Sequence, residues 1–396
     1  MNKKAILLLV VLLFSFIPLV SSNTEWFNSS FQYRNVYVID SSLIDEKLYD
    51  FPVLIYLNSS YISWNRVNDN LSDLRFYNVS NNLLSHEIDY FIENDYAYIW
   101  VKIPYINNVS DTYFFMYYGC FYAENLENKT NVWSNSYVMV QHMNDNSTST
   151  VLDSTSNDVD GIKFGVNTPI ETALGKIGNA QFFDGIGDDI DVVSSDFDFL
   201  TAESFTLESW IKTAVGTQQL IYESRTAARP FVIVRVNGNK IQAYVDDTVN
   251  TANLESTQSV NDDIFHHVVF VRDIPNDKIY LYIDGSSDAT PVADPTGDVG
   301  SGKMRLGQHY TTTTVGVQGI LDEMRITVGV GVSGVRDSVW VGVSYETQTD
   351  NLFTASNFEV IPEEITLRSL VFMALALAVT AIALVIVGWK RDKLTS

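Results

Sequence analysis

Apolar and polar positions alternate in short runs along most of this chain. Residues 23–360 show almost no helical period, and their apolar runs are rich in β-branched and aromatic residues. Turn pairs such as Asn237-Gly238 and Asp284-Gly285 separate the runs at strand-like intervals. Many short strands with frequent turns are typical of all-β sandwiches. The predicted strands are Val36–Ile39, Val53–Leu57, Tyr96–Ile103, Tyr113–Tyr118, Tyr137–Gln141, Ser204–Ile211, Phe231–Val236, Phe265–Val271, Ile279–Ile283 and Met304–Leu306.

The first apolar run that breaks this pattern is at the N-terminus. Two lysines precede an uncharged run over residues 5–20, and two serines follow it. A charged, apolar and then small-residue order is that of a secretory signal. We predict a signal peptide over residues 1–22, with an uncleaved anchor as the alternative.

The second run is near the C-terminus. Leu370–Trp389 is uncharged, and as a helix its twenty residues span about 30 Å, the hydrocarbon thickness of a membrane. The basic residues in the tail 390–396 predict a cytoplasmic end. Residues 357–369 form an acidic connector. We therefore predict a single-pass type I membrane protein, with two tandem β-sandwich domains (23–136 and 137–356) outside and one transmembrane helix.

The charge balance restricts the partners. The formal net charge is −23, whereas nucleic-acid binding needs a positive face, so we expect no nucleic-acid partner. Cys120 is the single cysteine, so no disulfide can form within the chain although the body is predicted to be secreted.

Glycosylation sequons cluster in the first half of the chain. In a secreted chain, N-x-S/T positions are glycan acceptors on the surface. Chance is the alternative, because this half is rich in Asn and Ser. The predicted acceptors are Asn28, Asn58, Asn70, Asn78, Asn108, Asn128 and Asn146.

A series of motifs from Val138 onward resembles one family. The blocks VMVQHMNDN, GKIGNAQFFDGIGDDIDV, FTLESWIKT, HHVVFVRD, KIYLYIDGS, MRLGQH and GILDEMRI occur in this order. They are similar to a laminin-G-like domain of the concanavalin A-like lectin/glucanase superfamily. The resemblance implies a jelly roll of two antiparallel sheets. One departure is Phe265, where the family often has Trp.

Sequence blocks of the first domain also resemble a known family. The blocks YRNVYVI, DLRFYN, LLSHEIDYF, AYIWVKIP and MYYG are similar to a domain of unknown function. That domain occurs in archaeal and bacterial surface proteins ahead of a lectin-like jelly roll. Cys120 stands where Asn usually follows YYG, and the resemblance implies no known activity.

The aspartates of FFDGIGDDIDVV suggest calcium, because Ca²⁺ prefers carboxylate and carbonyl oxygens. The spacing does not fit an EF-hand. By the resemblance, a calcium at the rim of a sheet would take Asp184, the Gly187 carbonyl and Asp322, with Asp188 in reserve. The alternative is that Asp184 makes a turn and that the later aspartates are the solvent face of a strand.

Aromatic and basic residues of the second domain are the candidates for ligand binding. A sugar or protein ligand would meet loops or the face of the jelly roll, where the candidates are Tyr222, Arg225, Tyr244, His309 and Tyr310. Glycosidase chemistry needs two carboxyl groups about 5–9.5 Å apart. On a strand, Glu87 and Glu93 lie roughly 20 Å apart, and Glu87 with Asp89 has no supporting third group. We therefore predict no catalytic residues and no enzyme activity.

These observations predict an anchored surface protein for recognition or adhesion, which binds carbohydrate or a cell-surface protein through its lectin-like domain. The setting is an archaeal or bacterial cell membrane, or a viral envelope. The alternatives are a structural component of the cell envelope or virion surface without a ligand pocket and, less favoured, a glycoside hydrolase.

Overall fold

The computed structural model describes residues 26–165, 168–356 and 359–360. Within it, Tyr33–Val360 forms one compact unit. In the part of the chain so described, no helix is long and apolar enough to cross a membrane. Four predictions lie wholly or mostly outside the described residues: the signal peptide 1–22, the connector 357–369, the transmembrane helix 370–389 and the tail 390–396.

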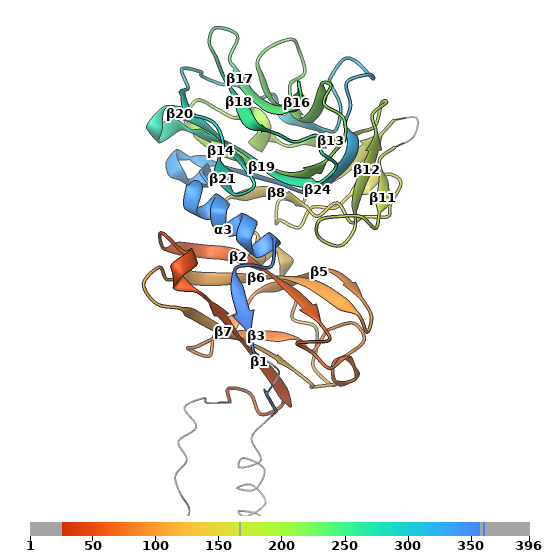
Figure 1. The fold of residues 1–396 in the computed structure, drawn as a ribbon, viewed down its shortest axis with the longest axis vertical. Helices are drawn as coiled ribbons and strands as arrows, with labels where there is room; N and C mark the ends of the chain where they lie inside the picture. Colours follow the sequence, from red (N-terminus) through yellow and green to blue (C-terminus); the bar gives the residue numbers. More distant parts are fainter. Residues whose placement is uncertain (1–25, 166–167, 357–358, 361–396) are drawn as a thin grey trace, which may run out of the picture. The chain divides into compact units, whose positions relative to one another are not determined.

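The first domain consists of two antiparallel sheets around an apolar core (Figure 1). One sheet has the order β25-β1-β7-β3-β4, with β26 also paired to β1, and the other has the order β2-β6-β5. Their strands are β1 Tyr33–Ile39, β2 Leu48–Asn58, β3 Arg75–Asn78, β4 Leu83–Leu84, β5 His86–Ile92, β6 Tyr96–Ile106, β7 Thr112–Tyr118, β25 Phe353–Ala355 and β26 Glu359–Val360. Short helices are η1 Ser41–Leu43, η2 Trp64–Arg66 and α2 Lys129–Val132.

Two strands of this first domain come from the far end of the chain. Tyr37 of β1 pairs with Ala355, and Arg34 pairs with Glu359. The domain boundary predicted at residue 136 does not include these C-terminal strands in the first domain. Strands of two or three residues are too short to show an alternation of polar and apolar positions.

The second domain is a jelly roll of an eight-stranded and a nine-stranded sheet (Figure 1). The first has the order β18-β17-β16-β15-β23-β13-β10-β9; the second has β11-β12-β24-β14-β19-β20-β21, with β8 on β24 and β22 on β20. The strands are β8 Tyr137–Gln141, β9 Thr150–Val151, β10 Gly161–Phe164, β11 Ile170–Thr172, β12 Ala180–Asp184, β13 Asp189–Val193, β14 Glu203–Lys212, β15 Gln219–Ser224, β16 Phe231–Asn237, β17 Lys240–Asp246, β18 Thr251–Ser259, β19 Phe265–Asp273, β20 Lys278–Ile283, β21 Ser286–Ser287, β22 Val292–Ala293, β23 Lys303–Leu306 and β24 Gln318–Val330. Short 3-10 helices are η3 Ser195–Asp198, η4 Ile274–Asn276 and η5 Gly331–Gly334.

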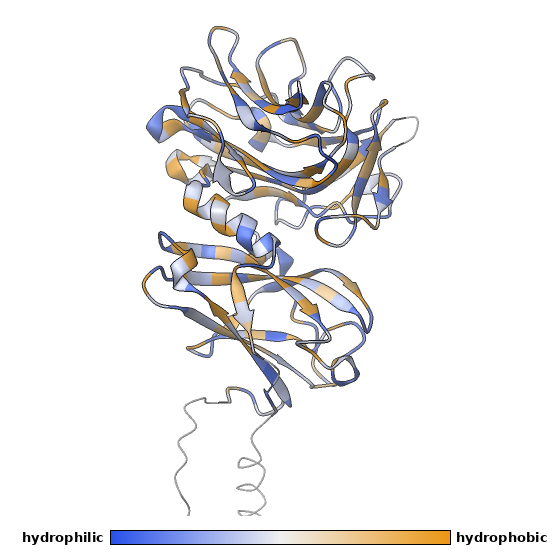
Figure 2. Ribbon diagram, in the orientation of Figure 1, coloured by the Kyte–Doolittle hydropathy of each residue, from blue (hydrophilic) through white to orange (hydrophobic). Residues whose placement is uncertain are grey.

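Alternation places one face of each strand in the core. Phe205, Leu207 and Ile211 of β14 are buried between the sheets, whereas Glu208 bonds to groups outside that core. Apolar and polar segments alternate along the strands of both domains in Figure 2. The hydrophobic effect therefore fixes which side chains remain on the outer faces.

The helix α3, Ser338–Gln348, follows the jelly roll. The Asp337 carboxylate caps it by accepting the Trp340 N–H at 2.9 Å. Leu54 of β2 donates its N–H to Thr347 at 2.8 Å, and Trp210 of β14 donates to Gln348 at 2.7 Å. The helix thus contacts both domains.

Candidate binding site

A row of side chains crosses the outer face of the eight-stranded sheet. Asp191, Arg305, Glu223, Ile233 and Tyr244 follow one another in register on five adjacent strands. Their strand neighbours, such as Leu306 and Val234, enter the core between the sheets. The row therefore lies on the face that is turned away from the core.

One end of this row is a dense set of ion pairs. Arg305 donates to both oxygens of Asp191 at 2.7 and 2.8 Å, and Lys303 donates to the same carboxylate at 2.6 Å. Burial opposes ionisation of Asp191, but hydrogen bonds from these two cations outweigh it and lower its pKa. At Asp189, burial dominates over the nearby Arg305 and raises the pKa to about 6.

The centre of the row is a cluster around Glu223. The Arg225 guanidinium lies 2.8 Å from Glu223 Oε1 and donates to His309 Nε2 at 2.6 Å. Tyr310 donates its backbone N–H to Glu223 and its hydroxyl to the Thr226 carbonyl. Burial raises the pKa of Glu223, which Arg225 only partly offsets. Burial and Arg225 lower the pKa of His309, so its imidazole is neutral at pH 7.

Several buried polar atoms of this region accept or donate no hydrogen bond within the described residues. Arginines face Glu223 and Asp189, but one oxygen of each carboxylate lacks a hydrogen bond with suitable geometry. Buried polar groups are nearly always hydrogen-bonded, so each exception suggests a missing partner such as water or a ligand. The atoms are Asp188 Oδ1, Asp189 Oδ2, Glu223 Oε1, Arg225 Nε and Gln308 Nε2.

The structure brings most of the predicted binding residues to this face. Arg225, His309 and Tyr310 form the cluster, and Tyr244 lies in the same row under the Arg235 guanidinium, 4.9 Å from its ring centre. The prediction of Tyr222 is wrong. This side chain is 1% exposed, and its hydroxyl donates to the Glu208 carbonyl at 2.5 Å.

The error at Tyr222 has a simple cause. Neighbouring residues on β15 point to opposite faces, so Tyr222 enters the core and Glu223 faces outward. Sequence reasoning missed Glu223, Arg235 and Arg305. A charge between apolar positions, as in VIVRV and KMRL, was the available signal for an outward position.

The proposed calcium ligands do not converge on one point. Asp184 pairs with Gln318 on β24, and Asp322 lies four residues farther along that strand, about 13 Å away at 3.3 Å per residue. Asp322 is fully buried, and its Oδ2 accepts the N–H groups of Lys176 and Ile177. Asp188 lies beside Asp184 and accepts its N–H at 2.9 Å. The three predicted ligands thus do not fit a single ion, and calcium binding stays a prediction.

A buried charge cluster joins the two domains. His142 of the jelly roll lies 2.9 Å from Glu323, 3.2 Å from Glu87 and 3.3 Å from Asp89, the last two on β5 of the first domain. Arg325 pairs with Glu323 and stacks 4.4 Å from the Trp100 ring centre. All these ionisable side chains are at most 6% exposed.

The pKa values of the ionisable groups in this cluster shift in different directions. Burial opposes charge on His142, but Asp89, Glu323 and Glu87 outweigh it and raise its pKa well above the usual value. Burial raises the pKa of Asp89, whereas His142 overcomes burial at Glu87 and lowers its pKa. Atoms of Asp89, His142 and Glu323 lie within 4.8 Å of one another and could hold a metal ion. Each already has a protein partner, so we regard the cluster as a joint between domains.

The two adjacent histidines of β19 also have structural partners. His266 bonds to Asp284 at 2.9 Å, and His267 bonds to Glu208 at 3.0 Å. They contact different residues, in agreement with the expectation that strand neighbours point to opposite faces.

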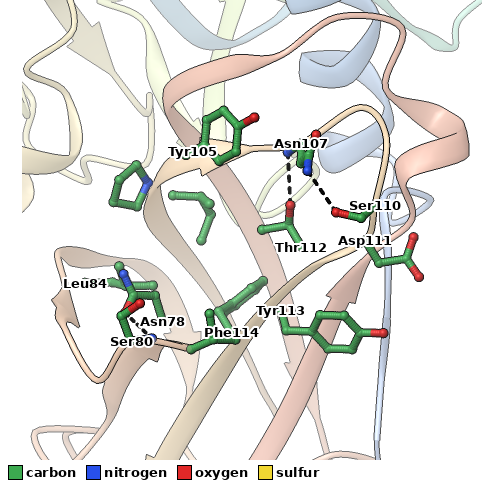
Figure 3. A pocket seen from close by; sticks show the side chains of 13 residues that line it. Asn78, Ser80, Leu84, Tyr105, Asn107, Ser110, Asp111, Thr112, Tyr113 and Phe114 are labelled. Atoms are coloured by element: carbon green, nitrogen blue, oxygen red, sulfur yellow. Dashed lines mark hydrogen bonds between the residues drawn. The ribbon is translucent and has the colours of Figure 1, made fainter.

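A further pocket of about 310 Å³ lies at one end of the first domain (Figure 3). Tyr105 and Tyr113 line it, but its polar groups bond to one another: Asn107 donates to Ser110 at 2.8 Å, and Asn78 accepts the Ser80 N–H at 3.0 Å. Asn78 is also a predicted glycan acceptor at the rim. All seven predicted acceptors are exposed or half-buried, and their glycosylation stays a prediction.

These features define a two-domain, all-β protein with a lectin-like jelly roll and a polar outer sheet face. Comparison with protein families identifies its parts. Residues 183–329 match the concanavalin A-like lectin/glucanases superfamily, and residues 70–159 match a domain of unknown function, DUF2341. Both resemblances predicted from the sequence are confirmed, in the predicted order. A comparison with curated proteins gives no match.

Similar solved structures include two toxin domains and one domain of an arabinanase. The binding domain of Paraclostridial Mosquitocidal Protein 1 is 10% identical with a TM-score of 0.44, and the match covers 54% of this chain and 53% of that one. The botulinum neurotoxin serotype D binding domain is 14% identical with a TM-score of 0.43, covering 56% and 53%. Domain 4 of AbnA, a GH43 extracellular arabinanase from Geobacillus stearothermophilus, in complex with arabinotriose, is 19% identical with a TM-score of 0.41, covering 52% and 97%. The match spans about half the length of each toxin domain.

Proposed function

We propose that this protein is a recognition or adhesion protein that binds carbohydrate, alone or on a glycosylated surface partner, through the outer face of its eight-stranded sheet. The observation that carries the proposal is the cluster around Glu223. It combines buried polar atoms without hydrogen-bond partners with the rings of Tyr244 and Tyr310. The hydroxyl groups of a sugar can bond to these polar atoms, and the apolar face of its ring can stack on the tyrosine rings.

The proposed setting is a membrane surface. Its support is the sequence alone: the secretory pattern of residues 1–22 and the uncharged run Leu370–Trp389. We place the body outside an archaeal or bacterial cell, or on a virion.

Binding without catalysis is the favoured chemistry. A glycosidase needs two close carboxyl groups that a substrate can reach. Glu87 and Asp89 are close, but their side chains are 6% and 0% exposed and bond to Trp133, His142 and Trp100. On the sheet face, the Asp191 carboxylate is neutralised by two cations, which suits binding better than proton transfer.

A glycan array with the purified full chain tests the proposal. Arg225→Gln and Tyr244→Ala should each weaken binding at least about tenfold, because each removes a ligand contact of roughly 1.4 kcal/mol or more. The matched control is Tyr113→Ala, which truncates an exposed tyrosine of the first domain. If both sheet variants keep the melting temperature of the unmodified chain and neither loses binding, the proposed site is refuted.

A further inference from the structure

A second pocket, of about 260 Å³, lies where β2, β6, the end of α3 and the loop before β12 meet. Its walls include Tyr56, Tyr98, Lys176 and Asp350. None of the residues that line it belongs to the polar sheet face, so the pocket would be a second, separate binding site. We propose that this pocket binds a neutral sugar ring of an oligosaccharide.

The tyrosines supply the aromatic wall. Tyr56 and Tyr98 are registered partners on β2 and β6, with ring centres 5.1 Å apart, and both are half-buried. Tyr96 and Tyr90 continue this surface at 5.8 Å and 6.2 Å between successive ring centres. Half-exposed tyrosines present a flat apolar face and a hydroxyl together, which matches a sugar ring with its hydroxyl groups.

Lys176 lines the same pocket, and its loop is anchored through the backbone. The buried Asp322 carboxylate accepts the N–H groups of Lys176 at 2.6 Å and Ile177 at 3.0 Å. Ile177 is 1% exposed in the core of the first domain. At Gly178, with φ +61°, a Cβ would lie 2.6 Å from the Tyr90 ring, so only glycine permits this approach. These contacts therefore fix the backbone of Lys176 at the edge of the pocket.

The polar groups of the pocket have unused hydrogen-bonding capacity. In the described part of the chain, the Lys176 ammonium contacts the Trp210 ring at 4.5 Å but donates no hydrogen bond. The Asp350 carboxylate and the hydroxyls of Tyr56 and Tyr98 likewise have no hydrogen-bond partner among the described residues. Burial lowers the pKa of Lys176, which is the cost of holding its ammonium near the pocket without a hydrogen-bond partner.

The charge balance selects a neutral ligand. Lys176 is the one cation among the residues that line the pocket, and Asp350 balances it. Asp322 behind the loop and the net charge of −23 oppose a polyanion. A sugar hydroxyl both donates and accepts, so adjacent hydroxyls can bond to a lysine and an aspartate together.

The test uses the purified full chain and defined neutral gluco-, manno-, galacto- and arabino-oligosaccharides of two to four units, with oligouronates for comparison. Tyr56→Ala, Lys176→Gln and Asp350→Asn should each weaken binding of a neutral oligosaccharide at least about tenfold. The matched control is Tyr49→Ala, which lies on β2 outside the pocket and should bind normally. Asp350 is exposed, so Asp350→Asn keeps the test valid if Tyr56→Ala does not fold.

Arg225→Gln separates this site from the sheet face. Binding of a neutral oligosaccharide that survives Arg225→Gln and is lost in the pocket variants supports the proposal. Binding that is unchanged in all three pocket variants, or binding of the oligouronates alone, overturns it. No oligosaccharide binding at all also overturns it. A sheet-face ligand that is lost only in Arg225→Gln would leave the proposed function intact while removing this second site.

Discussion

Glu208 shows how one buried residue can link stability to pH. It is a fully buried carboxylate on β14 that contacts Arg325, His267 and Ser344. Burial opposes its ionisation, but Arg325 and these hydrogen bonds outweigh burial and lower the pKa to about 2. A carboxyl whose folded pKa is depressed stabilises the fold above its unfolded pKa of 4.5, and this contribution is lost as the pH falls toward 2.

A folded pKa of about 2 against 4.5 in the unfolded chain corresponds to an effect on the order of 3 kcal/mol at neutral pH. We expect Glu208→Gln to lower the free energy of unfolding strongly at pH 7 and much less at pH 3. Urea denaturation at both pH values measures the two differences. An equal loss at pH 7 and pH 3 would show that the charge of Glu208 does not matter.

The residues of the binding face show what sequence reasoning could reach. Arg225, His309 and Tyr310 were selected because they are donors and rings in loops, and they do lie together. Tyr222 was predicted wrongly and Glu223 was missed, because a short strand does not reveal which of two neighbours faces the core. Lys176 and Tyr98 line one pocket only because distant segments of the chain meet there, which no local pattern encodes.

At the level of elements, long strands were predictable and the helix was not. The predicted strand Tyr96–Ile103 lies within β6, and Phe265–Val271 lies within β19. The sequence of α3, SVWVGVSYETQ, is rich in β-branched residues, and its buried positions follow helical spacing on one face. Three of them, Ser344, Thr347 and Gln348, are polar, so the buried face shows no clear apolar stripe and periodicity could not identify the helix.

The cap of α3 provides a test at this scale. Asp337→Ala removes the acceptor for the Trp340 N–H and should cost about 1 kcal/mol, or roughly 2–4 °C in Tm. Asp95→Ala is the control, because its exposed carboxylate accepts no hydrogen bond within the described residues. Equal melting temperatures for the two variants would mean that the cap does not limit the stability of the helix.

For the whole molecule, the two domains share their cores. The core of the first domain includes Ile177 from a jelly-roll loop, Trp340 and Val343 from α3, and Leu352 from the segment after it. The charge cluster around His142 adds buried ion pairs between the domains. Removing one side of such pairs leaves uncompensated buried charges.

The first domain should therefore not fold alone. We expect a fragment of residues 26–136 to lack a cooperative thermal transition, whereas residues 26–360 should show one. Circular dichroism during heating compares the two fragments. A sharp transition of the short fragment would show that the shared core is dispensable.

The strand β1 also determines how the molecule would respond to tension. Its neighbours β25 and β26 are the last described segments of the chain, and the Arg34–Glu359 ion pair at 2.7 Å fastens the second of them. In a protein held at the C-terminal side and pulled through a ligand on the jelly roll, the chain carries the load from β26 through β25 to α3, and both strands are hydrogen-bonded to β1. A pull along the strands loads these hydrogen bonds in parallel, so they must break together rather than one by one. The few residues of β25 and β26 would in this way resist the unfolding of the first domain under force.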